Sequence, residues 1–275
     1  MAGELLQYSG LITKIKAMEG RLLTREEYEH ILELQTVHET IAFLQEQRSY
    51  GKIYGGHDEI QHRGQVEALI YNSIREDYES ICRFCNPVQR SALRLYEKQL
   101  QYENAVPELD TSYFTEVWKR IGAFRQRRMQ RILREVFGTQ IDWLNLMWMY
   151  RAKRFFGQKK AEIYAMLIPV HYKLKKPEIQ RMAEAEKIEE FLEIIGATSY
   201  FRGKDAIVQL QDEVSYHVVM QKMYQRLCRK YPASLAPVFS YLYHKEQEIQ
   251  KLTTALEGIR YQVPEQDIRT LILQE

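Results

Sequence analysis

The chain has 275 residues, of which 45% are hydrophobic and 28% are charged, and its formal net charge is +2. Because basic and acidic residues nearly balance, the composition argues against a protein that coats a polyanion and favours a solvated surface with many ion pairs. Its three cysteines are too few for a disulfide framework, which fits a reducing compartment. Glu4 and Lys14 interrupt any signal-peptide core, and apolar runs such as 144–150 are shorter than the roughly 20 residues that span a membrane. We therefore expect a cytoplasmic protein without a membrane span.

The first long apolar stripe begins at residue 66 and recurs every three or four residues, as one face of an amphipathic helix does. Proline disfavours helical geometry in the residue before it and cannot donate a backbone hydrogen bond, so Asn86-Pro87 is predicted to end or kink this helix. The helical pattern resumes over 91–104. The stripe consists of Val66, Ile70, Ile74, Tyr78, Ile81 and Cys85.

Beyond a loop predicted at 107–111, a long helical pattern extends from Tyr113 to Tyr150, with a predicted break at Gly138-Thr139. Two short apolar runs follow, between Ile179 and Ile195, and their register slips from one run to the next. That slip indicates a tight helical hairpin, with Gly196 capping its end. The last long helices are expected at 216–230 and 233–258. No strand-like alternation persists anywhere, so the predicted fold class is all-α.

Several segments of the chain resemble one another. The tetrapeptide at 198–201 repeats the one at 111–114, and Ser49-Tyr50 is a weaker third copy. A long helical stretch follows each copy and closes on an acidic, amide-rich turn, at 102–104, 142–146 and 246–249. Because a repeating unit normally cannot bury its apolar face alone, these similarities predict a compact array of helical units.

Two longer alignments support the repeat. A shift of 145 residues places Pro87 on Pro232, Tyr96 on Tyr241 and Glu103 on Glu248. A second block aligns 22–50 with 173–200, with about one residue of slip, so that Tyr50 meets Tyr200. The middle copy lacks this block, because only 105–110 separates its flanks. We therefore predict a first unit at 1–104, an abbreviated middle unit at 105–156 and a third unit at 157–275.

The chain carries several weak hints of chemistry. Cys82 and Cys85 have metal-ligand spacing, but only Cys228 remains as a further cysteine, and both lie on or beside the apolar stripe, where core packing is the simpler reading. The seven histidines form no recognised ligand pattern, His57 follows Gly55-Gly56 in a predicted polar turn, and 51–56 lacks the order of a phosphate-binding loop. We assign no catalytic, cofactor-binding or metal-binding residue.

A basic stripe is the one candidate binding surface. Its members recur at i, i+7, i+11 and i+14 within the pattern 113–150, opposite the apolar face that carries Trp118 and Met129. The stripe could be a solvated helix face, or it could meet an acidic protein partner or a nucleic-acid backbone. The near-neutral net charge and the lack of a recognised nucleic-acid-binding pattern weigh against nucleic acid. The candidate partner-binding residues are Arg120, Arg127, Arg131 and Arg134.

Motifs in a fixed order give the chain a family resemblance. They are the opening 8–23, Ile141-Asp142-Trp143-Leu144-Asn145-Leu146 leading to Arg151-Ala152-Lys153, Leu167-Ile168-Pro169, Ala197-Thr198-Ser199-Tyr200 and Lys245-Glu246-Gln247-Glu248-Ile249. In this order they resemble the C-type central-stalk component of V/A-type rotary ATPases, whose eukaryotic equivalent is the d-type component. The resemblance extends over essentially the whole chain.

The resemblance implies a non-enzymatic rotor subunit, shaped as a funnel of three similar helical units with pseudo-threefold symmetry. Such a rotor part joins the membrane proteolipid ring to central-shaft subunits of the D and F type, and transmits torque for ion transport or ATP synthesis. It is peripheral to the cytoplasmic membrane through the ATPase membrane sector, and needs neither cofactor nor nucleic acid.

Other functions remain open on the residues alone. A generic helical-repeat scaffold or adaptor in another cytoplasmic complex fits every composition and periodicity argument equally well. An enzyme and a basic-helix RNA binder are further alternatives, which catalytic turnover or steeply salt-dependent RNA retention would reveal.

Overall fold

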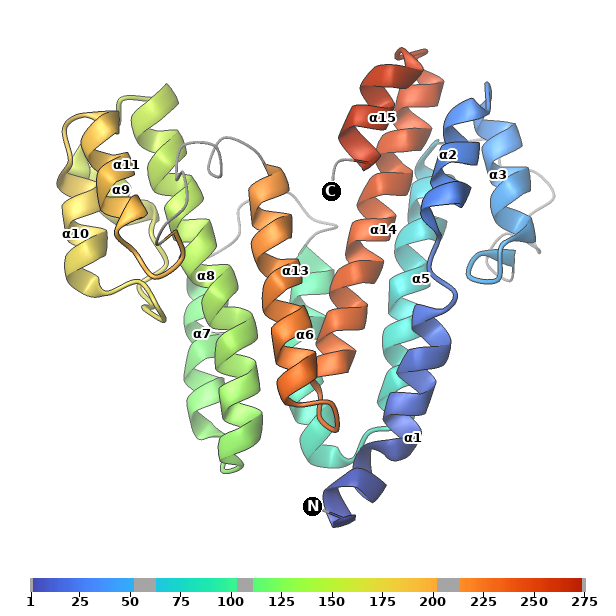
Figure 1. Cartoon of the computed structure of the whole chain (residues 1–275), viewed down its shortest axis with the longest axis horizontal. Helices are drawn as coiled ribbons and strands as arrows, with labels where there is room; N and C mark the ends of the chain where they lie inside the picture. The colour runs from blue at the N-terminus through green and yellow to red at the C-terminus, as the bar shows by residue number, and fades with distance from the viewer. Residues whose placement is uncertain (1, 52–62, 103–110, 202–212, 274–275) are drawn as a thin grey trace. The chain divides into compact units, whose positions relative to one another are not determined.

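The computed structural model describes residues 2–51, 63–102, 111–201 and 213–273, and throughout these ranges the regular structure is helical (Figure 1). The all-α prediction is thus confirmed. The helices are α1 (Ala2–Glu19), α2 (Arg25–Glu33), α3 (Val37–Glu46), α5 (Arg63–Arg83), α6 (Pro87–Tyr102), α7 (Thr111–Ala123), α8 (Arg127–Phe155), α9 (Lys160–Met166), α10 (Lys176–Glu184), α11 (Ile188–Gly196), α13 (Glu213–Lys230), α14 (Ala236–Arg260) and α15 (Glu265–Leu273).

The chain forms two compact units. The first contains residues 1–90 and 231–275, and the second contains residues 91–230, so α6 begins in one and ends in the other. These units are defined by contacts, whereas the three predicted units are defined by internal sequence similarity. The division at 104/105 and 156/157 therefore stays a prediction, as does the pseudo-threefold funnel.

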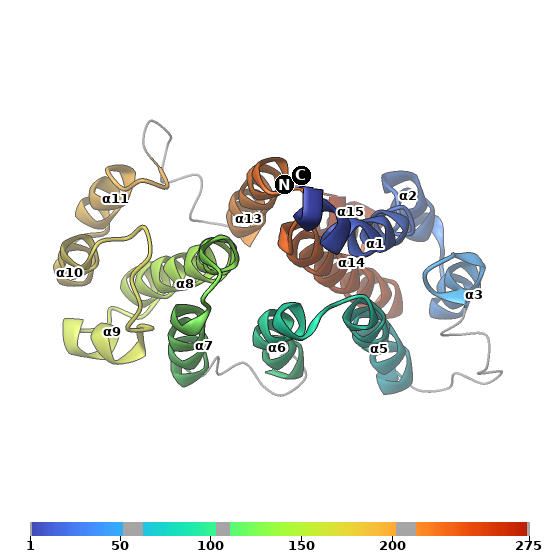
Figure 2. The same ribbon diagram turned by 90° about the horizontal axis from the view of Figure 1, so that it is seen from below.

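Three long helices, α1, α5 and α14, pack together in the first unit, and the short helices α2 and α15 contact each other and α14 (Figures 1 and 2). The stripe predicted from residue 66 is its core: Ile70 and Ile81 are fully buried, and Ile74 is 4% exposed. Cys85 is buried within the same stripe, its thiol lies 3.4 Å from the carbonyl oxygen of Ile81, and burial raises its pKa to about 12. The core-packing interpretation of Cys85 is confirmed.

The corner between α5 and α6 forms where the sequence predicted a helix boundary. Asn86 donates its N–H to Oε1 of Gln89 at 2.8 Å, and Gln89 donates its N–H back to Oδ1 of Asn86 at 2.9 Å. Pro87 is the first residue of α6, where the missing N–H costs nothing because that position has no helical partner. Reciprocal capping by Asn86 and Gln89 therefore starts α6.

In the second unit, α8 packs against α7, α13, α9 and α11 (Figure 2). Its core gathers around Trp143, which is 1% exposed and stacks on Phe201 with ring centroids 5.5 Å apart. Arg226 on α13 donates to a carboxylate oxygen of Glu135 on α8 at 2.9 Å. The hydroxyl of Tyr113 on α7 donates to the carbonyl of Leu95 on α6 at 2.7 Å.

The break predicted at Gly138-Thr139 was wrong. The chain turns at 124–126 instead, and α8 continues without interruption through Gly138. There, a Cβ atom would lie 2.5 Å from Cγ of Tyr172, so glycine is needed for close packing and not to end a helix. The side-chain amide of Gln130 donates to the carbonyls of Ile121 and Gly122, which closes the end of α7 at the actual turn.

The short hairpin predicted near 179–195 is confirmed as α10 and α11, and Gly196 is the last residue of α11. Helices α2 and α3 form a matching hairpin in the first unit. The pairs Glu27 and Glu178, and Glu39 and Glu190, occupy equivalent places, because each carboxylate accepts a backbone N–H at the start of its helix. The aligned blocks 22–50 and 173–200 thus share local structure.

The matching tetrapeptides do not share local structure. Residues 111–114 form the first turn of α7, whereas 198–201 form a non-helical turn after α11. The same four residues take two conformations because their neighbours differ, so the longer aligned blocks are the better guide to the repeat. The loop predicted at 107–111 lies, up to residue 110, outside the described residues.

Candidate functional site

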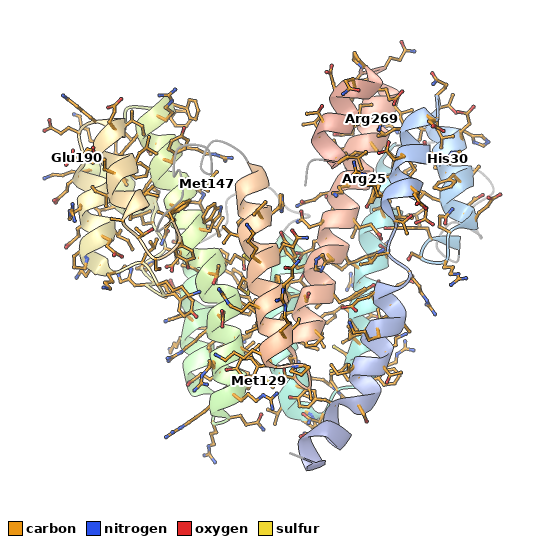
Figure 3. The ribbon with its side chains drawn as sticks, viewed as in Figure 1. Arg25, His30, Met129, Met147, Glu190 and Arg269 are labelled. Carbon is orange, nitrogen blue, oxygen red and sulfur yellow. The ribbon has the colours of Figure 1, made fainter. Side chains whose placement is uncertain are left out.

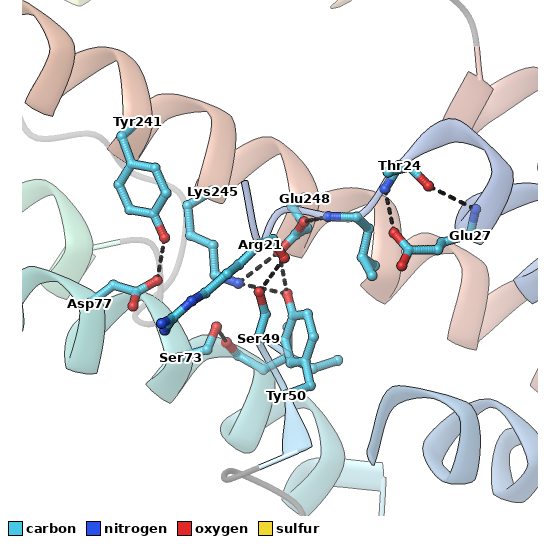
Figure 4. A network of polar contacts seen from close by, with 12 residues as sticks. Arg21, Thr24, Glu27, Ser49, Tyr50, Ser73, Asp77, Tyr241, Lys245 and Glu248 are labelled. Atoms are coloured by element: carbon cyan, nitrogen blue, oxygen red, sulfur yellow. Dashed lines mark hydrogen bonds and ion pairs between the residues drawn. The ribbon is translucent and has the colours of Figure 1, made fainter. Parts of the chain in front are cut away.

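One buried carboxylate holds both ends of the α2–α3 hairpin. Oε2 of Glu248, on α14, accepts the backbone N–H of Leu23 at 2.5 Å, just before α2. Its Oε1 accepts the hydroxyl of Tyr50 at 2.8 Å, just after α3 (Figure 4). The hairpin is therefore fixed to α14 at its entry and at its exit. We call this arrangement the Glu248 anchor.

Lys245 completes the Glu248 anchor. Its Nζ donates to Oε1 of Glu248 at 2.7 Å and to the hydroxyl oxygen of Tyr50 at 2.9 Å, and it lies 4.2 Å from the centroid of the Tyr50 ring. The Lys245 and Glu248 side chains are only 1% and 3% exposed. Breaking such a buried pair by removing one partner is strongly destabilising, because the other charge is left without compensation.

A second, partly buried contact lies close to the Glu248 anchor. The hydroxyl of Tyr241 on α14 donates to a carboxylate oxygen of Asp77 on α5 at 2.5 Å (Figure 4). Burial raises the pKa of the Asp77 carboxyl, although the hydrogen bond from Tyr241 and the charge of Lys245 oppose this shift. The contact ties α5 to α14 and gives the buried tyrosine hydroxyl the partner expected at a helix seam.

A buried carboxylate in the second unit likewise binds both ends of a hairpin. Asp142 on α8 accepts the backbone N–H groups of Tyr172, Lys173 and Leu174 at 3.2, 2.7 and 3.1 Å. It also accepts the hydroxyl of Tyr200 at 2.8 Å, so it holds the chain before α10 and after α11. Burial raises the pKa of Asp142, and the four hydrogen bonds oppose that rise. We call this arrangement the Asp142 anchor.

Asn145 extends the Asp142 anchor by one helical turn. Its side-chain amide donates to the carbonyl of Ile168 at 3.0 Å and accepts the N–H of Ile168 at 2.9 Å. Asp142 and Asn145 both lie on α8 and are fully buried. Together they satisfy the backbone of the segment between α9 and α10, which would otherwise leave polar groups unpaired in the core.

The two anchors use residues that the repeat placed together. Leu23 was aligned with Leu174 and Tyr50 with Tyr200, and both carboxylates belong to the acidic closures. The closures were predicted only as ends of the repeated segments, so the role of Asp142 and Glu248 as anchors was missed. A signal was present for Asp142, which is the one acidic residue in the largely apolar stretch 136–150, whereas Glu248 lies in the polar run 244–248. The buried aromatic ring shifts by one residue between the two anchors. In the first unit Tyr50 both binds the carboxylate and is fully buried. In the second unit Tyr200 binds the carboxylate but is half-buried, and the next residue, Phe201, is fully buried.

The predicted basic stripe is not one helix face. Arg120 lies on α7, and the remaining three arginines lie on α8, because the turn at 124–126 separates them. On α8, Arg127, Arg131 and Arg134 do share an exposed face at i, i+4 and i+7. Arg120 donates to Glu116 at 2.8 Å, and Arg134 lies 5.8 Å from the centroid of the Trp118 ring. The structure brings three of the four together.

Other sequence hints have simpler outcomes. Within the described ranges, no group of three or more His, Cys, Asp or Glu side chains is arranged to hold a metal ion. Among the same residues, no helix is both long and apolar enough to cross a membrane. Lys52, the Gly55-Gly56-His57 turn and Lys204 lie outside the described residues.

The chain matches one family model, described as ATP synthase (C/AC39) subunit, over residues 11–106 and again over residues 107–271. A search of curated proteins gives no significant match. The two matched segments together leave only the ends of the chain uncovered.

Proposed function

Because the chain belongs to the C/AC39 subunit family of V/A-type ATP synthases, we propose that it is a non-catalytic rotor subunit of the central stalk. In this role it couples the rotating shaft, built of D-type and F-type subunits, to the proteolipid ring in the membrane. It transmits torque during ATP-driven ion transport or ATP synthesis. It is held at the cytoplasmic face of the membrane by the ring and does not span the bilayer.

The observation that carries this proposal is the family match over nearly the whole chain, and the two anchors support it. A part that transmits torque must resist shear between its helices, and densely packed interiors have low compressibility. The Glu248 and Asp142 anchors fix each hairpin at two points through buried hydrogen bonds. Each hairpin would therefore move with the long helix that carries it and not independently.

We also propose that the basic face of α8 contacts an acidic surface of a neighbouring subunit. The side chains of Arg127, Arg131 and Arg134 are exposed, and Arg120 is exposed on the other arm of the α7–α8 hairpin. Charge reversal at Arg127 and Arg131 is expected to weaken retention of the chain in the complex most at low salt, and the difference from wild type should shrink as the salt concentration rises. Unchanged retention at every salt concentration would contradict this assignment.

The test of the rotor role is a pull-down of the tagged chain from gently solubilised native membranes, with mass spectrometry of the proteins recovered. We expect a small proteolipid, shaft subunits and nucleotide-binding subunits together. Recovery of a complex without proteolipid, while the membrane ATPase stays intact, would contradict the rotor role and favour a generic helical scaffold.

A further inference from the structure

Residues 151–160 form the corner between α8 and α9 and expose two adjacent aromatic rings. Phe155 is 68% exposed and Phe156 is 71% exposed. Single exposed apolar residues are ordinary, but two neighbouring phenylalanines at one helix end form a patch that needs an explanation. We call residues 151–160 the α8–α9 corner.

The backbone of the α8–α9 corner is closely held. Gly157 has a φ of 55°, in the left-handed region that suits a glycine after a helix end. The N–H of Gln158 then donates back to the carbonyl of Ala152 at 3.2 Å. The N–H of Lys159 donates to the carboxylate of Glu162 at 3.0 Å, which starts α9. The rings therefore project from a capped turn.

Side-chain contacts fix the α8–α9 corner to the α10–α11 hairpin. Nζ of Lys153 donates to the carbonyls of Ala183 and Ala185 at 2.9 and 2.6 Å, at the end of α10. Phe155 meets Tyr150 edge-on with ring centroids 6.3 Å apart, and Tyr150 in turn stacks on Phe191 of α11. The backbone of the corner is therefore ordered before binding, which lowers the entropic cost of recognition.

The charge of the α8–α9 corner has one sign. From residue 143 to residue 161 the sequence contains arginines and lysines but no aspartate or glutamate. Arg154, Lys159 and Lys160 are all exposed and flank the two rings. Aromatic residues and arginine are enriched at protein interfaces, and neighbouring positive charges steer an acidic partner toward them.

We propose that the α8–α9 corner is a docking site for an acidic segment of a partner protein. An apolar side chain of that segment packs on Phe155 and Phe156, and its carboxylates meet Arg154, Lys159 and Lys160. The inference rests on the proposed function in one respect, because the partner is then another subunit of the same complex. It deepens that function by assigning a surface and a partner chemistry.

The surroundings favour a narrow peptide over an anionic membrane surface. The carboxylate of Glu162 sits at the start of α9, and that of Glu190 acts electrostatically on Lys153. Figure 3 shows Glu190 among the neighbouring short helices. A broad anionic bilayer would have to approach these carboxylates as well, whereas a single acidic segment can contact the cations alone.

A photo-crosslink tests the proposal in the assembled complex. The photoreactive amino acid p-benzoylphenylalanine replaces Phe156, the complex is purified and irradiated, and the joined peptides are sequenced. We expect one adduct, on a peptide of another subunit that is rich in Asp and Glu. An adduct to lipid, an adduct to a peptide without acidic residues, or no adduct would overturn the proposal.

The matched control places the same photoreactive residue at Tyr261, which is 64% exposed in the first unit. The same adduct from both positions would mean non-specific capture and would overturn the site. In the Lys159→Glu/Lys160→Glu background, the adduct from position 156 should fall by about tenfold, as loss of two interface charges predicts. Thermal unfolding should not change, because both lysines are exposed.

The two proposals fail in different ways. If the wild-type chain purifies with a ring and shaft but position 156 gives no acidic adduct, only the docking site is wrong. If the chain purifies with some other complex, the rotor role is wrong. An acidic adduct from position 156 in that other complex still supports the docking site. If that complex gives no acidic adduct, the docking site is wrong as well.

Discussion

At the scale of single residues, the stability of the fold depends on carboxylates that are buried on its long helices. Asp142 and Glu248 accept backbone N–H groups from segments that are remote in sequence. Hydrogen bonds to a charged acceptor contribute more than neutral ones, and an orphaned buried N–H is costly. Substituting either residue should therefore lower the free energy of unfolding more than substituting an exposed carboxylate.

The variant Asp142→Asn measures the Asp142 anchor directly. Asparagine keeps one acceptor oxygen but turns an NH2 group toward backbone N–H donors, so we expect the free energy of unfolding to fall by about 2 kcal/mol or more. Chemical denaturation monitored by circular dichroism gives this value. The control Glu193→Gln, at an exposed position of the same unit, should stay within about 0.5 kcal/mol of wild type. Equal effects of the two variants would contradict the anchor.

The Asp77 carboxyl gives a pH dependence of known sign. Burial raises its pKa in the folded state, so the folded protein binds the proton more tightly than the unfolded chain. Its contribution to stability is full below the ordinary aspartate pKa of about 4 and is lost as the pH rises through the raised value.

The variant Asp77→Asn cannot titrate and keeps an acceptor for Tyr241. Its free energy of unfolding, relative to that of wild type, should therefore rise as the pH increases above about 4. Denaturation curves at a series of pH values test this. A difference that stays flat, or that falls with increasing pH, would show that burial does not control the titration of Asp77.

At the scale of elements, each anchor should control its own hairpin. Tyr50→Phe keeps the buried ring but removes the hydroxyl that binds Glu248 and Lys245, which should cost about 1 to 2 kcal/mol. Hydrogen exchange of α2 and α3 should speed up while that of α10 and α11 does not. Tyr200→Phe, which removes the hydroxyl bound to Asp142, should do the reverse. Uniform acceleration in both hairpins would argue against independent anchors.

The continuity of α8 depends on Gly138. In Gly138→Ala the new methyl group would meet the Tyr172 ring, so we expect a loss of about 1 to 3 kcal/mol in the free energy of unfolding. The matched variant Gly122→Ala, where nothing lies within 4 Å of the new atom, should be neutral or stabilising by up to about 1 kcal/mol. A stabilising Gly138→Ala variant would show that this close approach is absent in solution.

The elements also show how far the sequence alone could lead. Apolar periodicity and Asn86-Pro87 were enough for α5, α6 and the α10–α11 hairpin, because these depend on local signals. The turn at 124–126 was missed, because it contains neither proline nor glycine and its closure relies on Gln130, which lies beyond it. Gly138 was wrongly predicted to break the helix, because here glycine is needed for close packing against Tyr172 and not for a turn.

At the scale of the whole molecule, the family could be predicted from ordered motifs, whereas the anchors required coordinates. The closures at 142–146 and 246–249 were visible as acidic turns, but the segments that they hold lie about 30 and more than 200 residues away. Contacts of that range leave no periodic trace in the sequence. The basic face on α8 needed the true helix boundary at 124–126, which a local contact of Gln130 closes.

The proposed rotor role requires that this chain rotate with the shaft. The measurement is single-molecule rotation of the purified complex, immobilised through its nucleotide-binding subunits, with a bead fixed to this chain through a cysteine introduced at exposed Glu193. On addition of ATP the bead should turn continuously in one direction, in step with a bead on a shaft subunit. A bead that stays still on this chain, while the shaft of the same preparation turns, would contradict the rotor role.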